Sequence, residues 1–110
     1  MRQWDIYLYD FAQERPHPVV ILSNEEICAN PDIEYLNGLL CSSVRVERPL
    51  KRRETGLDEA DGLDWKTAVR CDFIYTLNKR LIGELRGHVS DVRQLELLRK
   101  IRFCFRWPLA

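Results

Sequence analysis

Residues 80–105, RLIGELRGHVSDVRQLELLRKIRFCF, contain a change of hydrophobic period that indicates the fold class. The first ten residues read as a last strand with a glycine near each end. From Ser90 onward, apolar residues recur every three or four positions, which predicts an amphipathic helix with Ser90 as N-cap and Pro108 as stop. The apolar face of this helix is expected to contain Val92, Leu95, Leu98, Ile101 and Phe105.

Upstream of this helix, the chain has the pattern of a strand-rich body. Alternation or β-branched apolar runs predict strands at residues 4–11, 18–23, 34–46 and 67–77. Residues 24–32 are expected to form a loop or a single helical turn, and residues 47–65 a loop, a short strand and a loop. Five or six strands followed by one helix predict a small, barrel-like antiparallel sheet with the helix packed on one side. The whole chain, residues 1–110, is expected to be one domain.

Composition and charge exclude several classes of protein. The 110 residues are 45% hydrophobic and 31% charged, with 17 basic and 17 acidic residues. No apolar run is long enough to span a membrane, and the N-terminal residues lack the pattern of a secretory signal, so we expect a cytoplasmic protein. The four cysteines contain no C-x-x-C pair and are expected to be reduced, buried thiols.

Two basic residues precede prolines in ERPHPVVILSN, residues 14–24. A residue before proline is held extended, and residues two apart in an extended chain point to the same side. Arg15 and His17 are therefore expected to project as a pair that suits an anionic ligand, with a guanidinium for charge and an imidazole for proton transfer. The alternative is that the two prolines stiffen a loop whose polar side chains face solvent.

The order of several motifs resembles the MazF/PemK family of toxins from bacterial toxin–antitoxin pairs. The motifs are WDIYLYDF, RPHPVVILSN, LNGLLCSS and DGLDWKTAVRCDFIYTLNKRLIGELRGHVS, and the resemblance extends from Trp4 into the C-terminal helix. It implies an SH3-like barrel of the MazF/PemK/CcdB type, usually as a homodimer. It also implies metal-independent endoribonuclease action on single-stranded RNA, often mRNA, without a cofactor, and neutralisation by a cognate antitoxin protein.

The resemblance also implies which residues form the catalytic centre. In the family, the arginine of an Arg-Pro pair acts together with hydroxyl residues at a strand end. The hydroxyls here are Ser42, or Ser43 as second choice. Aligning the Arg-Pro dipeptide selects Arg15, whereas aligning the following strand without gaps selects His17. RNA cleavage by its own 2′-hydroxyl needs a base, a stabiliser of phosphorane charge and an acid, and a histidine, an arginine and a serine supply these functions.

RNA must also be held by the protein. The loop VRVERPLKRRE concentrates positive charge that is expected to contact RNA or, alternatively, to be a solvated face, and Tyr75 could stack a base. Trp65 could also stack a base, although Trp65 and Phe73 are more simply interpreted as core residues. The loop residues expected to bind RNA are Arg45, Arg48, Lys51, Arg52 and Arg53.

Two other functions fit the same sequence. The family fold also occurs in gyrase-poisoning toxins, which bind a protein and cut nothing. Tyr75 and His17 stand where the family often has arginine, which favours a catalytically degenerate module that only binds or regulates. No cluster of side chains at metal-ligand spacing is evident. The surplus of aromatic residues near the C-terminus predicts a homodimer, because Phe103, Phe105 and Trp107 exceed what one helix face needs.

Overall fold

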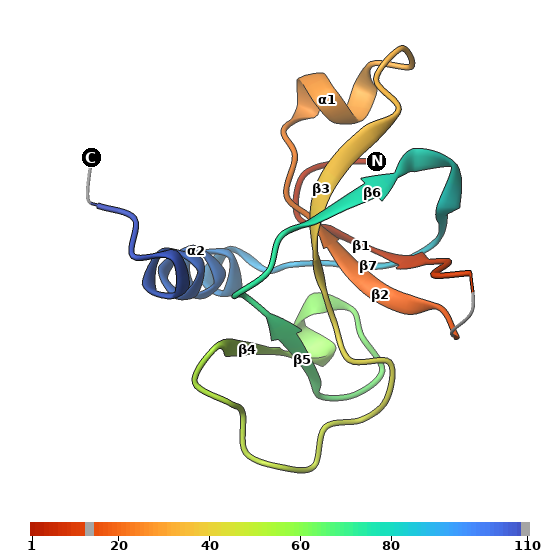
Figure 1. Cartoon of the computed structure of the whole chain (residues 1–110). Coiled ribbons are helices and arrows are strands. Elements are labelled where there is room, and N and C mark those ends of the chain that lie inside the picture. The colour runs from red at the N-terminus through yellow and green to blue at the C-terminus, as the bar shows by residue number, and fades with distance from the viewer. Residues whose placement is uncertain (13–14, 109–110) are drawn as a thin grey trace.

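The computed structural model describes residues 1–12 and 15–108 as two antiparallel sheets and a C-terminal helix (Figure 1). The larger sheet has the strand order β6–β3–β2–β1–β7, and the smaller one pairs β4 with β5. An isolated bridge between Cys41 and Val69 connects the two sheets. The predicted fold class, mostly β with a C-terminal helix, is confirmed, although β6 and β7 remain edges and the described strands do not close a barrel. The strands are β1 Asp5–Tyr9, β2 His17–Ile21, β3 Tyr35–Leu40, β4 Glu54–Leu57, β5 Thr67–Arg70, β6 Tyr75–Asn78 and β7 Ile82–His88.

Strand β2 lies at the centre of the larger sheet. Its residues Val19, Val20 and Ile21 are all fully buried, because one sheet face meets the core around the smaller sheet and the other face is covered by further apolar side chains. Gly38 of β3 explains how the strands approach so closely. A Cβ at this position would lie 2.8 Å from the carbonyl oxygen of Val20 and 2.6 Å from a methyl group of Leu77. Only a residue without a side chain fits at this close approach of two strands.

Residues 67–77 form two strands instead of the single strand that the sequence predicts. β5 ends at Arg70, the chain bends over residues 71–74, and β6 begins at Tyr75. β5 pairs with β4, whereas β6 pairs with β3 in the other sheet. The alternation continues on both sides of the bend, so it does not reveal that the chain changes partners. We call residues 71–74 the corner.

Four short or helical elements complete the chain. They are α1 Glu25–Ala29, the 3₁₀ turns η1 Glu59–Asp61 and η2 Lys79–Leu81, and α2 Asp91–Phe105. The expected single helical turn is α1, whose N-cap Asn24 accepts a hydrogen bond from the Ile27 amide. Lys79 donates to the carbonyl oxygens of Ile27 and Asn30, which ties the end of α1 to η2.

Helix α2 covers the core with a face that shares only Ile101 with the predicted one. Leu97 and Ile101 are its buried residues, whereas Val92, Leu95 and Leu98 are 67%, 54% and 50% exposed. Apolar side chains occupy two neighbouring stripes of this helix, and periodicity alone does not say which stripe meets the sheet. Ser90 holds the N-cap position without a side-chain cap bond, and the helix ends before Pro108 with residue 106 in the left-handed conformation.

The four cysteines are all free thiols. Cys28, Cys41 and Cys71 are buried free thiols, and Cys104 is a half-buried free thiol. Burial raises the pKa of Cys71 to about 11, which leaves this thiol protonated at neutral pH.

Within residues 1–12 and 15–108, no helix is both long and apolar enough to cross a membrane.

Candidate functional site

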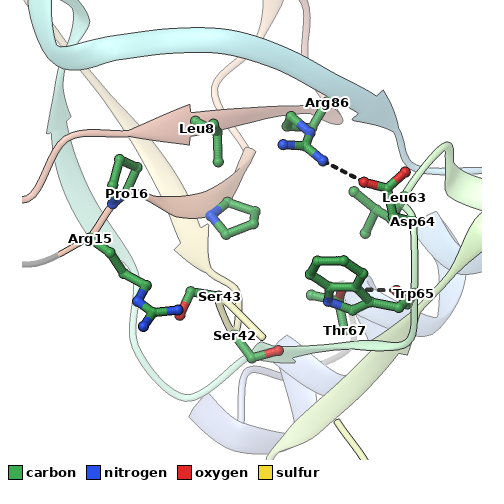
Figure 2. Close-up of a pocket in the computed structure, with 11 residues that line it drawn as sticks. Leu8, Arg15, Pro16, Ser42, Ser43, Leu63, Asp64, Trp65, Thr67 and Arg86 are labelled. Carbon is green, nitrogen blue, oxygen red and sulfur yellow. Dashed lines mark hydrogen bonds and ion pairs between the residues drawn. The ribbon is translucent and has the colours of Figure 1, made fainter. Parts of the chain in front are cut away.

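A pocket of about 280 Å³ lies where β2 begins and β3 ends. The loop before β5 and one side chain from β7 form its far wall (Figure 2). Two of the predicted catalytic elements meet here, the Arg-Pro pair and the hydroxyls after β3. The lining residues are Leu8, Arg15, Pro16, Pro18, Ser42, Ser43, Leu63, Asp64, Trp65, Thr67 and Arg86. We call this set the pocket.

Ser42 is fixed in the pocket by the backbone of β5. Its amide donates to the Ala68 carbonyl oxygen at 2.8 Å, and its hydroxyl oxygen accepts the Ala68 amide at 3.0 Å. Because the hydroxyl oxygen accepts this bond, the hydroxyl proton can be donated to a bound anion. The second hydroxyl residue, Ser43, also lines the pocket.

Arg15 brings a positive charge to the same space. Its guanidinium extends towards Ser43 in Figure 2. Within residues 1–12 and 15–108, no carboxylate forms an ion pair with Arg15. On the opposite wall, Arg86 is paired with Asp64 at 2.8 Å. The pocket thus contains one guanidinium that a carboxylate neutralises and one that can bind an anion.

The structure does not place His17 beside Arg15 in the pocket. The Nδ1 atom of His17 lies 3.2 Å from the Cys41 carbonyl oxygen, and the ring packs edge-on against Phe11 with 5.7 Å between centroids. The neighbours Pro16 and Pro18 line the pocket, so alternation along β2 directs His17 to the other face. A carbonyl oxygen only accepts, so Nδ1 donates this bond and Nε2 is the basic nitrogen of the neutral ring.

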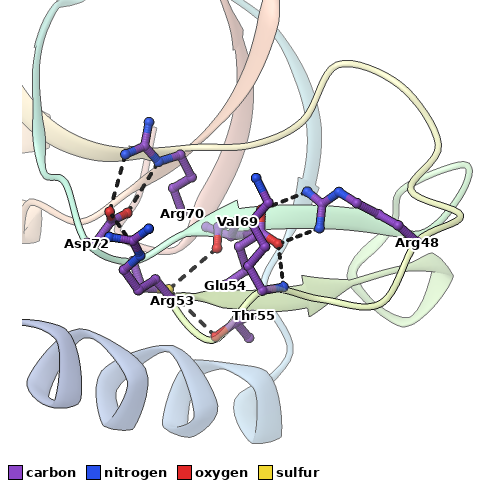
Figure 3. A network of polar contacts seen from close by, with 9 residues as sticks. Arg48, Arg53, Glu54, Thr55, Val69, Arg70 and Asp72 are labelled. Atoms are coloured by element: carbon purple, nitrogen blue, oxygen red, sulfur yellow. Dashed lines mark hydrogen bonds and ion pairs between the residues drawn. The ribbon is translucent and has the colours of Figure 1, made fainter.

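The predicted RNA-binding loop contains cations in different environments. Arg48 makes a two-pronged contact with Glu54 at 2.7 and 2.9 Å (Figure 3), and this hydrogen bonding is the main cause that lowers the pKa of Glu54. Arg52 lies over the Phe103 ring at 5.0 Å. Arg45 and Lys51 have exposed side chains. Because its guanidinium is already paired with Glu54, Arg48 has mainly a structural role in this loop.

A second arginine–carboxylate cluster, which the sequence reasoning missed, lies at the start of the corner. Arg70 contacts Asp72 at 3.2 and 3.3 Å, and Arg53 approaches the same carboxylate at 3.7 Å (Figure 3). The hydrogen bond from Arg70 is the main cause that lowers the pKa of Asp72. The spacing of Arg70 and Asp72, two residues apart on one side of an extended chain, was the available signal. We call Arg48, Arg53, Glu54, Arg70 and Asp72 the carboxylate network.

The aromatic residues near these sites are more exposed than expected. Phe73 is 50% exposed, so its interpretation as a core residue is wrong; it belongs to the corner and to neither strand that the corner joins. Trp65 is 37% exposed and lines the pocket. Tyr75, which is expected to stack a base, lies 4.5 Å from Phe73 between ring centroids.

Three polar pocket residues were not anticipated from the sequence. Asp64 and Arg86 form the ion pair of the far wall, and Thr67 donates its hydroxyl to the Trp65 carbonyl oxygen at 3.1 Å. Asp64 and Thr67 come from one segment, whereas Arg86 is distant in sequence, and the pairing of β7 with β1 brings it near β2. Across the described part of the chain, no three or more His, Cys, Asp or Glu side chains cluster as metal ligands would.

Comparisons with known proteins agree on one family. A family model described as a PemK-like, MazF-like toxin of type II toxin–antitoxin systems matches residues 2–105. No curated protein sequence matches the chain. Several solved structures share the fold, and their sequence identity is too low to show more than the fold.

Two of these structures come from mycobacteria. An endoribonuclease in complex with its cognate antitoxin from a Mycobacterial species has a TM-score of 0.81 and 17% identity, covering 100% of this chain and 99% of that one. The Mycobacterium tuberculosis toxin MazF-mt6 has a TM-score of 0.77 and 19% identity, covering 96% of this chain and 99% of that one. The likeness therefore includes the complete fold.

Proposed function

The chain belongs to the PemK-like, MazF-like toxins of type II toxin–antitoxin systems, and on that premise we propose that it is an endoribonuclease that cuts single-stranded RNA. The observation that carries the proposal is the pocket, in which Arg15 lies with the hydroxyl residues Ser42 and Ser43. A guanidinium with neighbouring hydroxyl donors matches a phosphodiester in charge and geometry. The solved endoribonuclease of the same fold supports the assignment.

In this proposal the scissile phosphate binds between Arg15 and Ser42. As the RNA 2′-oxygen attacks, negative charge grows on the phosphorane oxygens. Arg15 stabilises this charge, and the Ser42 hydroxyl donates a hydrogen bond whose direction is set because its oxygen already accepts the Ala68 amide. Ser43 is the second choice for this hydroxyl role.

His17 is proposed as the proton-transfer group at the margin of the pocket. It lies between Pro16 and Pro18, both of which line the pocket, and it contacts the carbonyl of Cys41, the residue before Ser42. The contact with Cys41 orients the ring and leaves Nε2 as the basic nitrogen. Because the ring lies on the sheet face opposite the pocket lining, this role requires it to turn towards the pocket when RNA binds, so that it reaches the 2′-hydroxyl or the leaving oxygen.

The partners follow from the family and from the proposed substrate. We propose that a cognate antitoxin protein covers the toxin and that the toxin acts on RNA in the cytoplasm. We also propose a homodimer, which the exposed apolar stripe of α2 supports, because Val92, Leu95 and Leu98 present apolar surface to water. Phe105 and Trp107 stack with ring centroids 5.0 Å apart beside this stripe. Phe103 instead packs against the cations of Arg52, Lys100 and Arg106.

The test is cleavage of RNA by the purified protein in the presence of EDTA. Total bacterial RNA and synthetic single-stranded RNA are incubated with the protein, and the new RNA ends are mapped by sequencing. We expect discrete cuts that leave a 2′,3′-cyclic phosphate or a 3′-phosphate, because the attacking group is the 2′-hydroxyl. The absence of cleavage on every RNA would contradict the proposal and leave the binding functions.

A matched pair of serine variants tests the role of the pocket. Ser42→Ala is expected to lower the cleavage rate by about a hundredfold, since the loss of one donor to a developing oxyanion typically costs this much. Ser90→Ala is the control, because Ser90 makes no side-chain cap bond and lies outside the pocket. Equal rates in the two variants would remove Ser42 from the mechanism, and the Ser43→Ala variant would then identify the alternative hydroxyl.

The oligomeric state is tested by analytical ultracentrifugation at micromolar concentration. A dimer is expected for the unmodified chain, and the Leu95→Glu/Leu98→Glu variant should be monomeric because it places two charges on the apolar stripe. Monomer alone for the unmodified chain would overturn the homodimer.

A further inference from the structure

Four aromatic side chains form a continuous row across the start of β2 and the corner. The ring centroids are 5.7 Å apart for His17 and Phe11, 6.2 Å for Phe11 and Tyr75, and 4.5 Å for Tyr75 and Phe73. These rings meet edge-on or tilted, at 88°, 74° and 52°, so they do not cover one another as parallel stacks would. We call Phe11, His17, Phe73 and Tyr75 the aromatic row.

The aromatic row is open to solvent at its Phe73 end. Phe73 is 50% exposed, and Tyr75, Phe11 and His17 are each partly exposed. Burial of a phenylalanine ring normally stabilises a protein, so a ring left half in water does little for the core. The core positions on either side of the corner are already filled by Cys71 and Leu77, which are fully buried.

Positive charge lies directly beside the aromatic row. Arg70 and Arg53 share the single carboxylate of Asp72, so this group carries an excess of one positive charge. The side chains of Arg70 and Arg53 are 48% and 67% exposed. Asp72, the carboxylate that both arginines contact, directly precedes Phe73 in the chain. Aromatic faces next to exposed guanidiniums suit single-stranded nucleic acid, whose bases stack while its phosphates meet cations.

The aromatic row meets the pocket only at the end of the sheet where β2 begins, because Pro18 pairs with Leu8 on the pocket face whereas His17 pairs with Tyr9 on the other face. His17 lies between the pocket residues Pro16 and Pro18, and its Nδ1 contacts the Cys41 carbonyl, one residue before Ser42. A strand of RNA whose phosphate lies at Arg15 and Ser42 and which continues around this end of the sheet would have adjoining nucleotides over His17 and then over Tyr75 and Phe73.

We propose that the aromatic row is a stacking platform for the bases of single-stranded RNA on one side of the scissile phosphate. This inference rests on the proposed ribonuclease function and adds to it a binding subsite that stacks bases without requiring one base identity. Single-stranded RNA is favoured over a peptide partner because the exposed rings are bordered by guanidiniums with excess charge. Stacking on a ring face accepts every base, so the platform contributes affinity more than sequence choice.

The experiment uses an RNA oligonucleotide that contains the mapped cleavage site with a 2′-deoxynucleotide at the scissile position, which prevents cleavage. The adenine analogue 2-aminopurine replaces each nucleotide in turn, because stacking on an aromatic ring changes its fluorescence. Affinity is measured by anisotropy of an end label. The variants are Phe73→Leu, Tyr75→Leu and the double variant, which retain apolar bulk and remove the rings.

The unmodified protein is expected to quench 2-aminopurine at adjacent positions on one side of the scissile nucleotide. Each leucine variant should weaken binding by about tenfold and lose the quenching at its own position. Tyr35→Leu is the matched control, since Tyr35 is another exposed tyrosine, 52% exposed on β3, outside the aromatic row. Circular dichroism of each variant checks that the fold is intact.

The outcomes separate this inference from the proposed function. If the unmodified protein cuts RNA but the double variant binds and quenches like Tyr35→Leu, the platform is overturned and the ribonuclease assignment stands. The platform is also overturned, and the ribonuclease assignment also stands, if the double variant loses binding to an antitoxin peptide but keeps its binding to RNA. If the unmodified protein neither binds nor cuts RNA, the proposed function fails and the platform fails with it.

Discussion

The pocket and the carboxylate network both contain arginines, yet they offer an anion very different environments. In the pocket, Arg15 has no carboxylate partner among the described residues and lies with two hydroxyl residues. In the network, Arg48 is held by both oxygens of Glu54. A guanidinium that is already paired with a carboxylate must give up that partner before it binds a phosphate. The pairing state of each arginine therefore says more about where a phosphate binds tightly than the number of arginines does.

The largest effect that would sharpen this comparison is expected from Arg15→Ala. The variant should lower kcat/KM for RNA by about 10² to 10³, through weaker binding and a slower rate together, because the charge contacts the phosphate before and during the reaction. Arg48→Ala, measured below its unfolding temperature, should change kcat/KM by no more than about threefold, because the guanidinium of Arg48 is paired with the carboxylate of Glu54. Steady-state kinetics on one mapped RNA site compares the two, and equal losses would break the distinction.

A slightly smaller effect is expected from His17→Ala. The cleavage rate should fall by about a hundredfold while RNA affinity changes little, since a general acid–base group typically contributes at least this factor. Single-turnover rates as a function of pH, together with the dissociation constant for uncleavable RNA, separate the two quantities. Full activity in His17→Ala would assign the proton transfer to Arg15 and the pocket alone.

In the carboxylate network, the expected effect of a mutation is a loss of stability. Glu54→Gln removes a nearly buried carboxylate that accepts two bonds from Arg48 and one from the Lys51 amide, so the free energy of unfolding should fall by about 1–3 kcal/mol at pH 7. The folded-state pKa of Glu54 is lowered from 4.5, so its stabilising contribution is present above that value and is lost as the pH falls through the folded pKa.

Urea unfolding at several pH values tests this sign. The difference between the unmodified protein and Glu54→Gln should be constant from pH 6 to 8 and should shrink below about pH 4. Glu59→Gln, an exposed carboxylate on η1, is the control and should show a small difference throughout. A difference that grows at low pH would contradict the structural role of Glu54.

The smallest effect is expected from the remaining cations of the basic loop. Replacing Lys51, Arg52 and Arg53 with alanine should reduce the slope of log affinity against log salt by about 0.7 for each phosphate contact that is lost. Because Arg53 faces Asp72 and Arg52 lies over Phe103, we expect fewer than three such contacts. An unchanged slope would assign these side chains to solvent, and Arg80→Ala/Arg99→Ala gives the value for two exposed arginines elsewhere.

The fold was largely predictable from local patterns. Alternation found the strands, the change of period at Ser90 found α2, and the order of motifs identified the family that the family model confirms. Two features were not predictable because they depend on which elements become neighbours. Alternation across the corner does not show that β5 and β6 join different sheets, and the helical period does not show that Leu97 faces the core in place of Leu95.

The candidate site was predictable only in part for a similar reason. Arg15, Ser42 and Ser43 do meet in one pocket. His17 does not join them there. It belongs to β2, where alternation turns its side chain away from Pro18 and the pocket, whereas Arg15 precedes the strand and its long side chain reaches the pocket. Asp64 and Arg86 come from separate segments, and only tertiary contacts bring them to the pocket wall.

The corner between β5 and β6 has a consequence for how such toxins can diverge. Positions 73 and 75 lie where the chain leaves one sheet for the other, and Phe73 is half exposed while the adjoining Cys71 and Leu77 are fully buried. Mutations at the exposed position therefore meet little selection from folding, whereas the buried positions are constrained by packing. Changes at Phe73 can thus alter the affinity that the proposed platform gives for RNA while the folded scaffold keeps its stability.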